Sequence, residues 1–436
     1  MTNAELLIEF IKKCPTCFNV IDQIKVVLDN NGYKKLDEQG SFVLNLGEKY
    51  YVTRNDSSLI AFNIGKELDE NYAFNIVASH SDSPCFKLKP ICDYKTDIYN
   101  KVSVEPYGGM INSTWLDRPL SVAGRVVVRN GDKLITKIID IKEPVLLIPN
   151  LCVHFNRTIN DGYKYDYDRD MQPFVSQEIS SSVVNDILCK YLNVNENDII
   201  GFDLYAYVAE KGTLWGVNKE YILSPRLDDQ ECVYTSLRGL LTSYNPKNIN
   251  VFAVFDNEEV GSSTRQGANS DFLYNTLIRI NAGLKNQINR NFASLIASSF
   301  MVSADNAHAV HPCRIDVTDQ LNKVYMNKGI VIKFNASQSY TSDAYSASIV
   351  KQICQKLKIP YQVFTNKSGM RGGSTLGNIS NSQVSIKSVD IGLAQLAMHS
   401  AMECAGAIDV DYMIEFFKGY YSTNITFVDN EIHFEY

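Results

Sequence analysis

The sequence predicts an α/β fold, in which a mixed sheet is flanked by helices and a β-rich segment is inserted into the chain. Apolar runs such as "LIAFNIG" (residues 59–65) and "FNIVASHSDSP" (residues 74–84) are typical of short buried strands, and they alternate with helical patterns. From about residue 92 apolar and polar residues alternate with a period of two. The mixed helix and strand pattern returns after about residue 217.

These changes of pattern divide the chain into three parts. Residues 1–91 and 218–436 are expected to form one α/β domain, and residues 92–217 the β-rich insertion. Inside the insertion, "VVVRNGDKLITKII" places Asn130 and Gly131 between two strand patterns, which predicts a hairpin. The first stretch, "MTNAELLIEFIKKCPTCFNVIDQI", predicts an amphipathic helix with Leu6, Leu7, Phe10 and Ile11 on its apolar face.

Composition excludes several classes of protein. The 436 residues are 45% hydrophobic and 21% charged, with a net charge of −7, so nothing favours nucleic acid or an anionic membrane surface as a partner. No apolar window approaches the ~20 residues of a membrane span, and the N-terminus lacks a signal-peptide pattern. The ten cysteines show no framework spacing, so we expect reduced thiols and a cytoplasmic location. The "CPTC" motif is interpreted as a helix–loop boundary rather than a redox or zinc site.

Two adjacent carboxylates follow the apolar run in "NVFAVFDNEEVGSST", residues 250–264. Neighbouring side chains of an extended segment point to opposite sides, so Glu258 and Glu259 would face different surroundings. They are either exposed charges at a strand end, or a metal ligand beside a general base.

Histidines and further carboxylates occur in similar places. His80 and Asp82 follow a strand and share one face. Asp228 and its neighbour precede a helical pattern, where helix-capping acids are the simpler interpretation. His399 lies in a helical, otherwise apolar pattern, where a core histidine is the common case. Taken together, this mixture of imidazoles and carboxylates suits zinc or a similar divalent ion. The full set comprises His80, Asp82, Asp228, Asp229, Glu258, Glu259, Asp305, His308, His311 and His399.

Seven short motifs, in order, resemble the aspartyl aminopeptidase family of zinc metallopeptidases. They are "ASHSDSP", "SPRLDD", "FDNEEVGS", "SADNAHAVHP", "VIKFNASQSY", "GGSTLGNI" and "DIGLAQLAMHSAMECAG". The resemblance covers nearly the whole chain. It implies a zinc-aminopeptidase-like catalytic domain carrying an inserted β-rich domain for dimerisation, and cleavage of the first peptide bond of peptide substrates.

The resemblance also implies a role for each motif residue. His80, Asp228 and Asp305 would hold one of two divalent ions, and Asp228, Glu259 and His399 the other, with zinc expected ahead of manganese or cobalt. Glu258 would be the general base and Asp82 would orient His80. Substrate contacts are implied for Lys333, Tyr340, His308 and, reaching a neighbouring subunit, His154.

The family prefers acidic N-terminal residues and assembles as a dodecamer built from dimers, so both properties are expected here. Two alternatives remain open on the sequence. A related aminopeptidase with a neutral or other preference would keep the metal residues, since a single lysine carries the acidic preference. A non-catalytic metal-bound scaffold would have lost the base or a ligand, whereas all of these residues are present.

Overall fold

The computed structural model describes residues 1–177, 182–370 and 372–436. Within these residues the largest sheet has nine strands, and its centre is parallel. Its spatial order is β1 (Lys34–Lys35), β2 (Lys49–Arg54), β3 (Ser58–Ile64), β13 (Ile249–Phe255), β4 (Phe74–His80), β14 (Phe300–Ala304), β18 (Lys387–Gly392), β16 (Ile330–Phe334) and β17 (Tyr361–Thr365).

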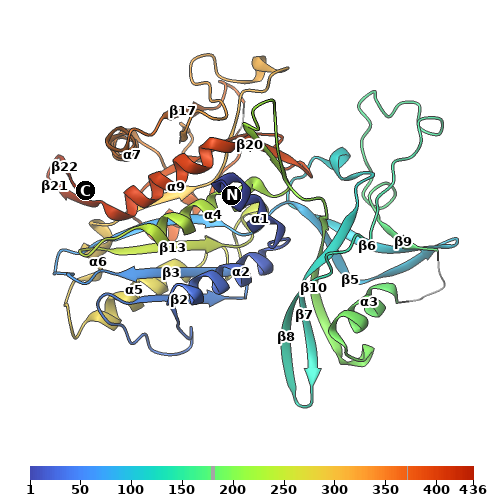
Figure 1. Cartoon of the computed structure of the whole chain (residues 1–436), viewed down its shortest axis with the longest axis horizontal. Coiled ribbons are helices and arrows are strands. Elements are labelled where there is room, and N and C mark those ends of the chain that lie inside the picture. The colour runs from blue at the N-terminus through green and yellow to red at the C-terminus, as the bar shows by residue number, and fades with distance from the viewer. Residues whose placement is uncertain (178–181, 371) are drawn as a thin grey trace.

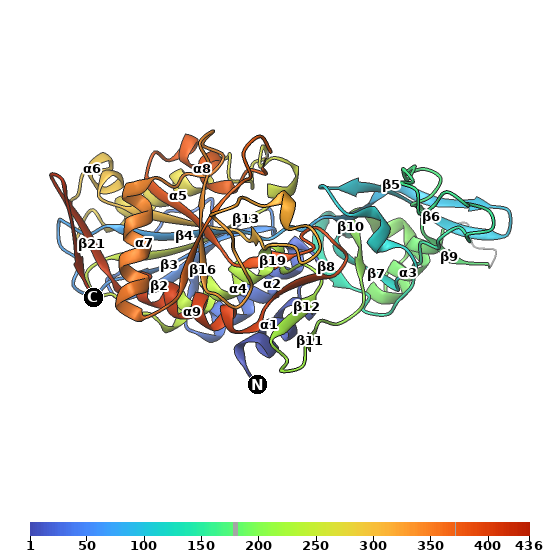
Figure 2. The same cartoon turned by 90° about the horizontal axis from the view of Figure 1, so that it is seen from above.

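Helices cover both faces of this sheet, as Figures 1 and 2 show. One face carries α1 (Asn3–Lys12), α2 (Cys17–Asn30), α4 (Leu227–Thr242), α7 (Ala344–Leu357) and α9 (Ala407–Ser422). The other face carries α5 (Phe272–Leu284), α6 (Phe292–Ala297) and α8 (Leu376–Gln383). The predicted α/β class, with a mixed sheet between helices, is confirmed.

Side-chain alternation along the strands explains the two cores. In β13, Phe252 and Val254 pack into the core beneath α4 and α9, while Val251, Ala253 and Phe255 pack into the core beneath α5 and α8. Every residue of β13 and β4 is buried. A strand buried on both faces favours a mostly apolar run, and both strands follow this pattern apart from Asn250 in β13 and Asn75, Ser79 and His80 in β4.

A second sheet projects to one side of the main body (Figure 1). Its order is β8 (Lys133–Asp140), β7 (Leu120–Asn130), β10 (Ile199–Val208), β5 (Cys85–Thr96), β6 (Tyr99–Tyr107) and β9 (Phe174–Ser176). It also carries α3 (Val183–Leu192) and the 3-10 turns η1 (Asn112–Trp115) and η2 (Glu196–Asp198). The Asn130–Gly131 hairpin is confirmed, since Asn130 pairs with Lys133 across β7 and β8. The domain limits at 92 and 217 remain a prediction.

A smaller sheet connects these two bodies. It contains β11 (Thr213–Trp215), β12 (Tyr221–Ser224), β20 (Glu403–Gly406), β19 (Ala394–Leu396) and β15 (Ala307–His308). The chain closes with the hairpin β21 (Asn424–Val428) and β22 (Glu431–Glu435), and η4 (Ile315–Val317) lies in a loop. No helix in the three described ranges is long and apolar enough to cross a membrane.

The N-terminal stretch breaks at the "CPTC" motif, where the sequence indicated a helix–loop boundary. It forms two helices, α1 and α2, because Pro15 has no backbone N–H to donate and Thr16 adopts an extended backbone. The "CPTC" motif lies at this break, and both of its cysteines are buried free thiols.

Candidate metal centre

The main sheet brings the predicted metal residues to one edge. His80 is the last residue of β4, and Asp305 follows β14 directly. The turn η3 (Glu258–Val260) follows β13 after only two residues. These three strands run parallel, so their carboxyl ends meet at the same edge, where ligand sites of α/β sheets usually lie.

We expected Glu258 and Glu259 to lie on an extended segment at the end of the strand, but they do not. The backbone of Asn257 is left-handed, with φ of +63°, and the two glutamates form a 3-10 turn. Asparagine tolerates this conformation better than other non-glycine residues. The two carboxylates therefore lie on one short turn instead of on opposite faces of a strand.

Seven of the described side chains converge at this edge of the sheet in three groups, and three of them belong to two groups each. The ligand atoms of His80, Asp228, Asp229 and Asp305 lie within 4.8 Å of one another, as do those of Asp228, Glu259 and His399. A third group combines His80 with Glu258 and Glu259. Asp228 contributes to the first two groups, so its two oxygens face two different sets of ligands.

Asp228 owes this position to the start of α4. Arg226 has a left-handed backbone, and Asp228 and Asp229 keep non-helical dihedral angles before the regular helix begins. One carboxylate oxygen of Asp228 lies 3.6 Å from Nε2 of His80, and the other lies 3.3 Å from Nε2 of His399. Asp228 therefore lies between the two imidazoles instead of capping the helix, which was the simpler interpretation of the sequence.

The cluster concentrates buried negative charge. Burial raises the pKa of Glu258 to about 8 and that of Asp305 to about 6. Burial alone would lower the pKa of His399, but the hydrogen bond to Asp228 and the charge of Glu259 raise it to about 10. These carboxyl groups ionise less readily than usual, and the neighbouring imidazole holds its proton more tightly than usual. Both shifts show that the cluster favours added positive charge.

This donor set fits a divalent metal ion. One carboxylate oxygen on each of Asp228, Asp229 and Glu259 is buried without a hydrogen-bond partner, which is costly unless a cation is nearby. Two imidazoles with several carboxylates are ligands that zinc accepts, and manganese and cobalt accept them too.

Asp82 fixes the geometry around two of the ligands. Its backbone oxygen lies 3.0 Å and one carboxylate oxygen 3.4 Å from Nδ1 of His80, so that nitrogen carries the proton and Nε2 faces Asp228. The same carboxylate accepts hydrogen bonds from the backbone N–H groups of Glu258 and Glu259, both at 3.1 Å. It therefore holds the glutamate turn in addition to orienting His80.

The apolar residues around His399 predicted a helix, but His399 does not lie on one. It lies in the connection between β19 and β20, with φ of +67°. Pairing of Gln395 with Ala405 draws this segment into a small antiparallel sheet and overrides its helical propensity. Nδ1 of His399 lies 2.7 Å from the backbone oxygen of Gly109, so its Nε2 is free to face Asp228 and Glu259.

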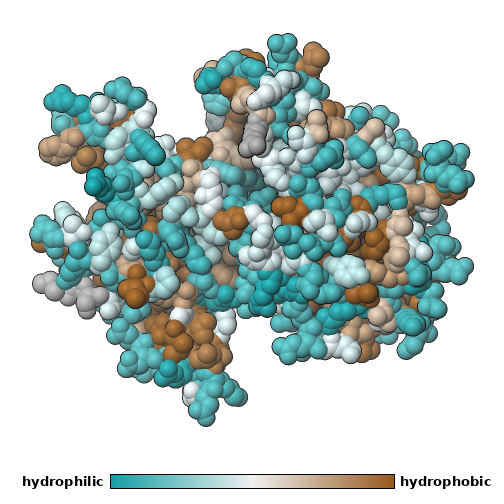
Figure 3. Space-filling model, turned by 180° about the vertical axis from the view of Figure 1, so that it is seen from behind, coloured by the Kyte–Doolittle hydropathy of each residue, from teal (hydrophilic) through white to brown (hydrophobic). Residues whose placement is uncertain are grey.

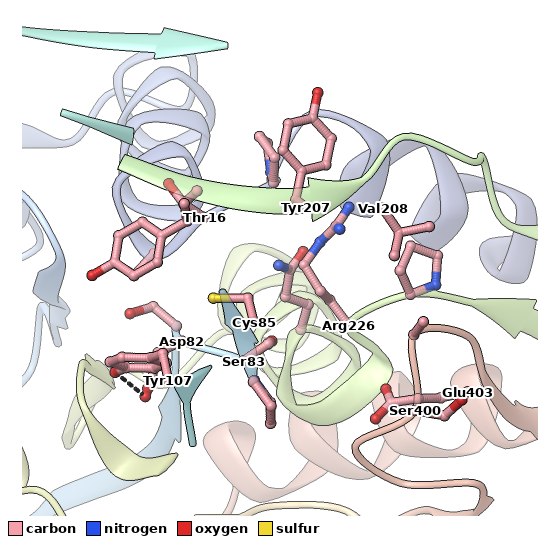
Figure 4. A pocket seen from close by; sticks show the side chains of 18 of the residues that line it. Thr16, Asp82, Ser83, Cys85, Tyr107, Tyr207, Val208, Arg226, Ser400 and Glu403 are labelled. Atoms are coloured by element: carbon pink, nitrogen blue, oxygen red, sulfur yellow. Dashed lines mark hydrogen bonds between the residues drawn. The ribbon is translucent and has the colours of Figure 1, made fainter. Parts of the chain in front are cut away.

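Glu403 was not singled out in the sequence, yet its carboxylate joins two parts of the cluster. It accepts hydrogen bonds from the backbone N–H of His399 at 2.6 Å and of Asp228 at 2.9 Å. Figure 4 shows it beside a narrow cavity of about 30 Å³, which Asp82, Tyr107 and Arg226 also line. Its only sequence signal is its place four residues after His399.

Lys333 and Tyr340 lie beside Asp305. The Lys333 ammonium donates to the backbone oxygens of Asp305 at 2.7 Å and Asn306 at 3.1 Å, and it is 3.7 Å from the Asp305 carboxylate. The ring of Tyr340 lies 5.1 Å from the ammonium. Only 2% of Lys333 is exposed, so its charge is held close to a predicted metal ligand.

The two remaining predicted substrate residues belong to none of the ligand groups. His308 is an exposed residue of β15, and it pairs with Gln395 in β19, the strand that leads to His399. His154 is exposed in the loop between β8 and β9, on the side of the second sheet.

Comparison with known proteins places this cluster in context. The profile of the family described as "Aminopeptidase I zinc metalloprotease (M18)" matches residues 10–421. The chain belongs to the M18 family of zinc metallo-aminopeptidases. The resemblance drawn from the motifs is thereby confirmed, and the protein is a zinc-dependent aminopeptidase, a hydrolase that removes residues from the N-termini of peptides.

Relatives of this M18 aminopeptidase match it end to end. "Probable M18 family aminopeptidase 2" of Clostridium novyi (strain NT) is 43% identical over 426 residues, which cover 96% of this chain and 98% of the relative. "Probable aspartyl aminopeptidase" of Ricinus communis is 34% identical over 473 residues, covering 98% and 96%.

Solved structures agree with the fold. The structure titled "Cryo-EM structure of the Ape4 and Nbr1 complex" has a TM-score of 0.91 and 32% identity, and the match covers 96% of this chain and 85% of that one. The structure titled "Structure of S. cerevesiae mApe1 dodecamer" has a TM-score of 0.84 and 26% identity, covering 96% of each chain.

Proposed function

We propose that this M18 aminopeptidase uses two divalent metal ions and releases N-terminal aspartate or glutamate in preference to other residues. The single observation that carries the two-ion proposal is the position of Asp228. Its carboxylate belongs to one ligand group with His80 and to another with His399, and a carboxylate between two ligand sets is what a pair of neighbouring ions requires.

His80, Asp228 and Asp305 would hold one ion, and Asp228, Glu259 and His399 the other. When bound, such ions lower the pKa of water and polarise a peptide carbonyl. Glu258 would accept the proton of the attacking water and return it to the leaving amine. Its burial-raised pKa of about 8 suits a group that must hold and release a proton near neutral pH.

The acidic preference rests on Lys333 and on a relative. The chain is 34% identical to a protein named as an aspartyl aminopeptidase. Lys333 places a positive charge beside Asp305, where a substrate carboxylate could pair with it, and Tyr340 lies next to it. His308 and His154 would contact substrate, the latter in a neighbouring subunit.

One observation favours the alternative of a neutral or broad preference. The Lys333 ammonium already donates to two backbone oxygens and lies against the carboxylate of Asp305. A lysine bound in this way could serve to hold Asp305, and the substrate side chain would then meet a less charged pocket.

The protein is further proposed to be a homo-oligomer, and specifically a dodecamer of dimers assembled through residues 92–217. A structure with a TM-score of 0.84 is described as a dodecamer. Hydrophobic residues also gather on the second sheet in Figure 3, and Leu134, Ile135 and Ile200 of its strands are exposed. Exposed apolar patches of this kind commonly mark protein interfaces. The cytoplasmic location stays a prediction from the sequence.

The test uses purified protein stripped of metal and reloaded with zinc, manganese or cobalt. Peptides beginning with Asp, Glu, Leu or Lys would be compared by kcat/KM, and bound metal would be counted per chain. Faster release of Asp or Glu with two ions bound is the expected result. Faster release of Leu or Lys would contradict the acidic preference, and a single ion at full activity would contradict the two-ion mechanism.

A further inference from the structure

One segment of the second sheet runs along the metal centre. Strand β6 ends at Tyr107, and the chain continues through Gly108 and Gly109 to η1. Although β6 belongs to the second sheet, this segment lies against both Glu259 and His399. These two residues belong to the same ligand group as Asp228.

The hydroxyl group of Tyr107 supports the turn that carries the glutamates. It donates to the Asp82 carboxylate at 2.7 Å, a contact drawn in Figure 4, and accepts from the side-chain amide of Asn257 at 2.9 Å. The Asp82 oxygen that it contacts is the one that accepts the backbone N–H of Glu259. Tyr107 therefore links the second sheet to both ends of the Asn257–Glu259 turn.

The next residue allows the segment to approach Glu259 closely. Gly108 has φ of +73°, and a Cβ atom on it would lie 3.1 Å from Cβ of Glu259. A side chain at this position would be strained by its backbone and would press on a predicted metal ligand. Glycine at position 108 thus permits both the left-handed backbone and the close approach to Glu259.

The following residues hold the His399 loop. The backbone oxygen of Gly109 accepts a hydrogen bond from Nδ1 of His399 at 2.7 Å, and this contact orients the ring so that Nε2 is directed at the ligand group. The backbone N–H of Ile111 donates to the backbone oxygen of His399 at 3.0 Å, and the Thr114 hydroxyl accepts from Ala401 at 2.9 Å. Three successive contacts fix both the ring and its backbone.

We propose that residues 107–114 are a positioning segment through which the second sheet sets the geometry of the Glu259 and His399 half of the metal centre. The proposal rests on the proposed function only in requiring that the cluster binds divalent metal. It gives the inserted sheet a role inside each chain, separate from any role in assembly. Groups that orient metal ligands typically contribute about 10–100-fold to metal affinity.

The experiment compares two variants of the segment with two matched controls. Gly108→Ala and Tyr107→Phe alter the segment. Gly32→Ala introduces the same backbone strain at φ of +78°, with no atom within 4 Å of the added carbon. Tyr51→Phe removes the hydroxyl of another buried tyrosine, which donates to Asp29 at 2.9 Å outside the segment. Zinc affinity and stoichiometry would be measured on the full chain by competition with a chromophoric chelator.

The expected result is that Gly108→Ala and Tyr107→Phe weaken one of two zinc ions about 10–100-fold, while both controls bind like the unaltered protein. Raising the zinc concentration should then restore part of the lost peptidase activity in the segment variants. Unchanged zinc binding in both variants, or equal losses in variants and controls, would overturn the inference alone. If the unaltered protein binds fewer than two ions, the two-ion proposal fails instead.

Discussion

Gly392 offers a direct way to displace one predicted metal ligand. It ends β18, and a Cβ atom on it would lie only 2.0 Å from the backbone oxygen of Asp305. Real contacts of this kind are essentially never shorter than 3.0 Å, so Gly392→Ala must push β18 and the backbone of Asp305 apart by about 1 Å. Metal–ligand distances tolerate only about 0.2 Å, so the shift is roughly five times that tolerance.

The expected result is a selective loss of metal. The same carbonyl oxygen accepts the Lys333 ammonium at 2.7 Å, so the displacement also disturbs that contact. We expect Gly392→Ala to weaken the ion held with Asp305 by about 10-fold or more, and overpacking to lower the free energy of unfolding by about 1–3 kcal/mol.

Gly65→Ala is the matched control. Its added carbon would lie 2.2 Å from the backbone oxygen of Pro246, a clash of similar severity at the other end of β3 from the metal centre. Zinc titrations and urea unfolding of metal-free protein would be run on both variants. The reasoning is refuted if Gly392→Ala binds two ions with unaltered affinity, or if Gly65→Ala loses metal to the same extent.

Three further changes test other residues. Glu258→Gln should retain both ions and lower kcat by about 10²–10⁴-fold, as expected for loss of a general base, and loss of metal would contradict that role. Lys333→Met should lower kcat/KM for Asp-peptides at least about 10-fold more than for Leu-peptides, whereas equal losses would mean that Lys333 acts by holding Asp305. Burial raises the pKa of Asp409 to about 7, above its value of about 3.9 in an unfolded chain. The folded protein therefore holds a proton that favours folding at low pH, and this contribution is lost as pH rises to about 7. The free energy of unfolding of Asp409→Asn, relative to the unaltered protein, should thus improve from about pH 4 to about pH 8 in urea titrations, and a constant difference would contradict the shift.

The parts of the fold that could be predicted are those where local sequence and burial agree. Mostly apolar runs predicted β4, β13 and β14, because strands covered on both faces have apolar side chains at most positions. Polar residues directly after such runs, His80 and Asp305 among them, then had to fall at one edge of the sheet. The Asn130–Gly131 hairpin followed from its turn residues alone.

The parts that could not be predicted depend on contacts between distant segments. The run around His399 has apolar residues at helical spacing, and only pairing between β19 and β20 makes it a turn. Tyr107 and Gly109 reach the centre from a different sheet, and no local pattern marks that approach. Glu403 likewise acts by accepting two backbone N–H groups, a role that leaves no motif.

The order in which the ligands occur along the chain has a consequence for protein synthesis. The cluster combines residues from position 80 to position 399, with the whole second sheet encoded between the first ligand and Asp228. At about 5–20 residues per second, a ribosome takes roughly a quarter of a minute to a minute to travel between these positions. Throughout that time the emerging chain has an incomplete cluster. The peptidase therefore cannot act on newly made polypeptides until nearly all of its own chain has been translated.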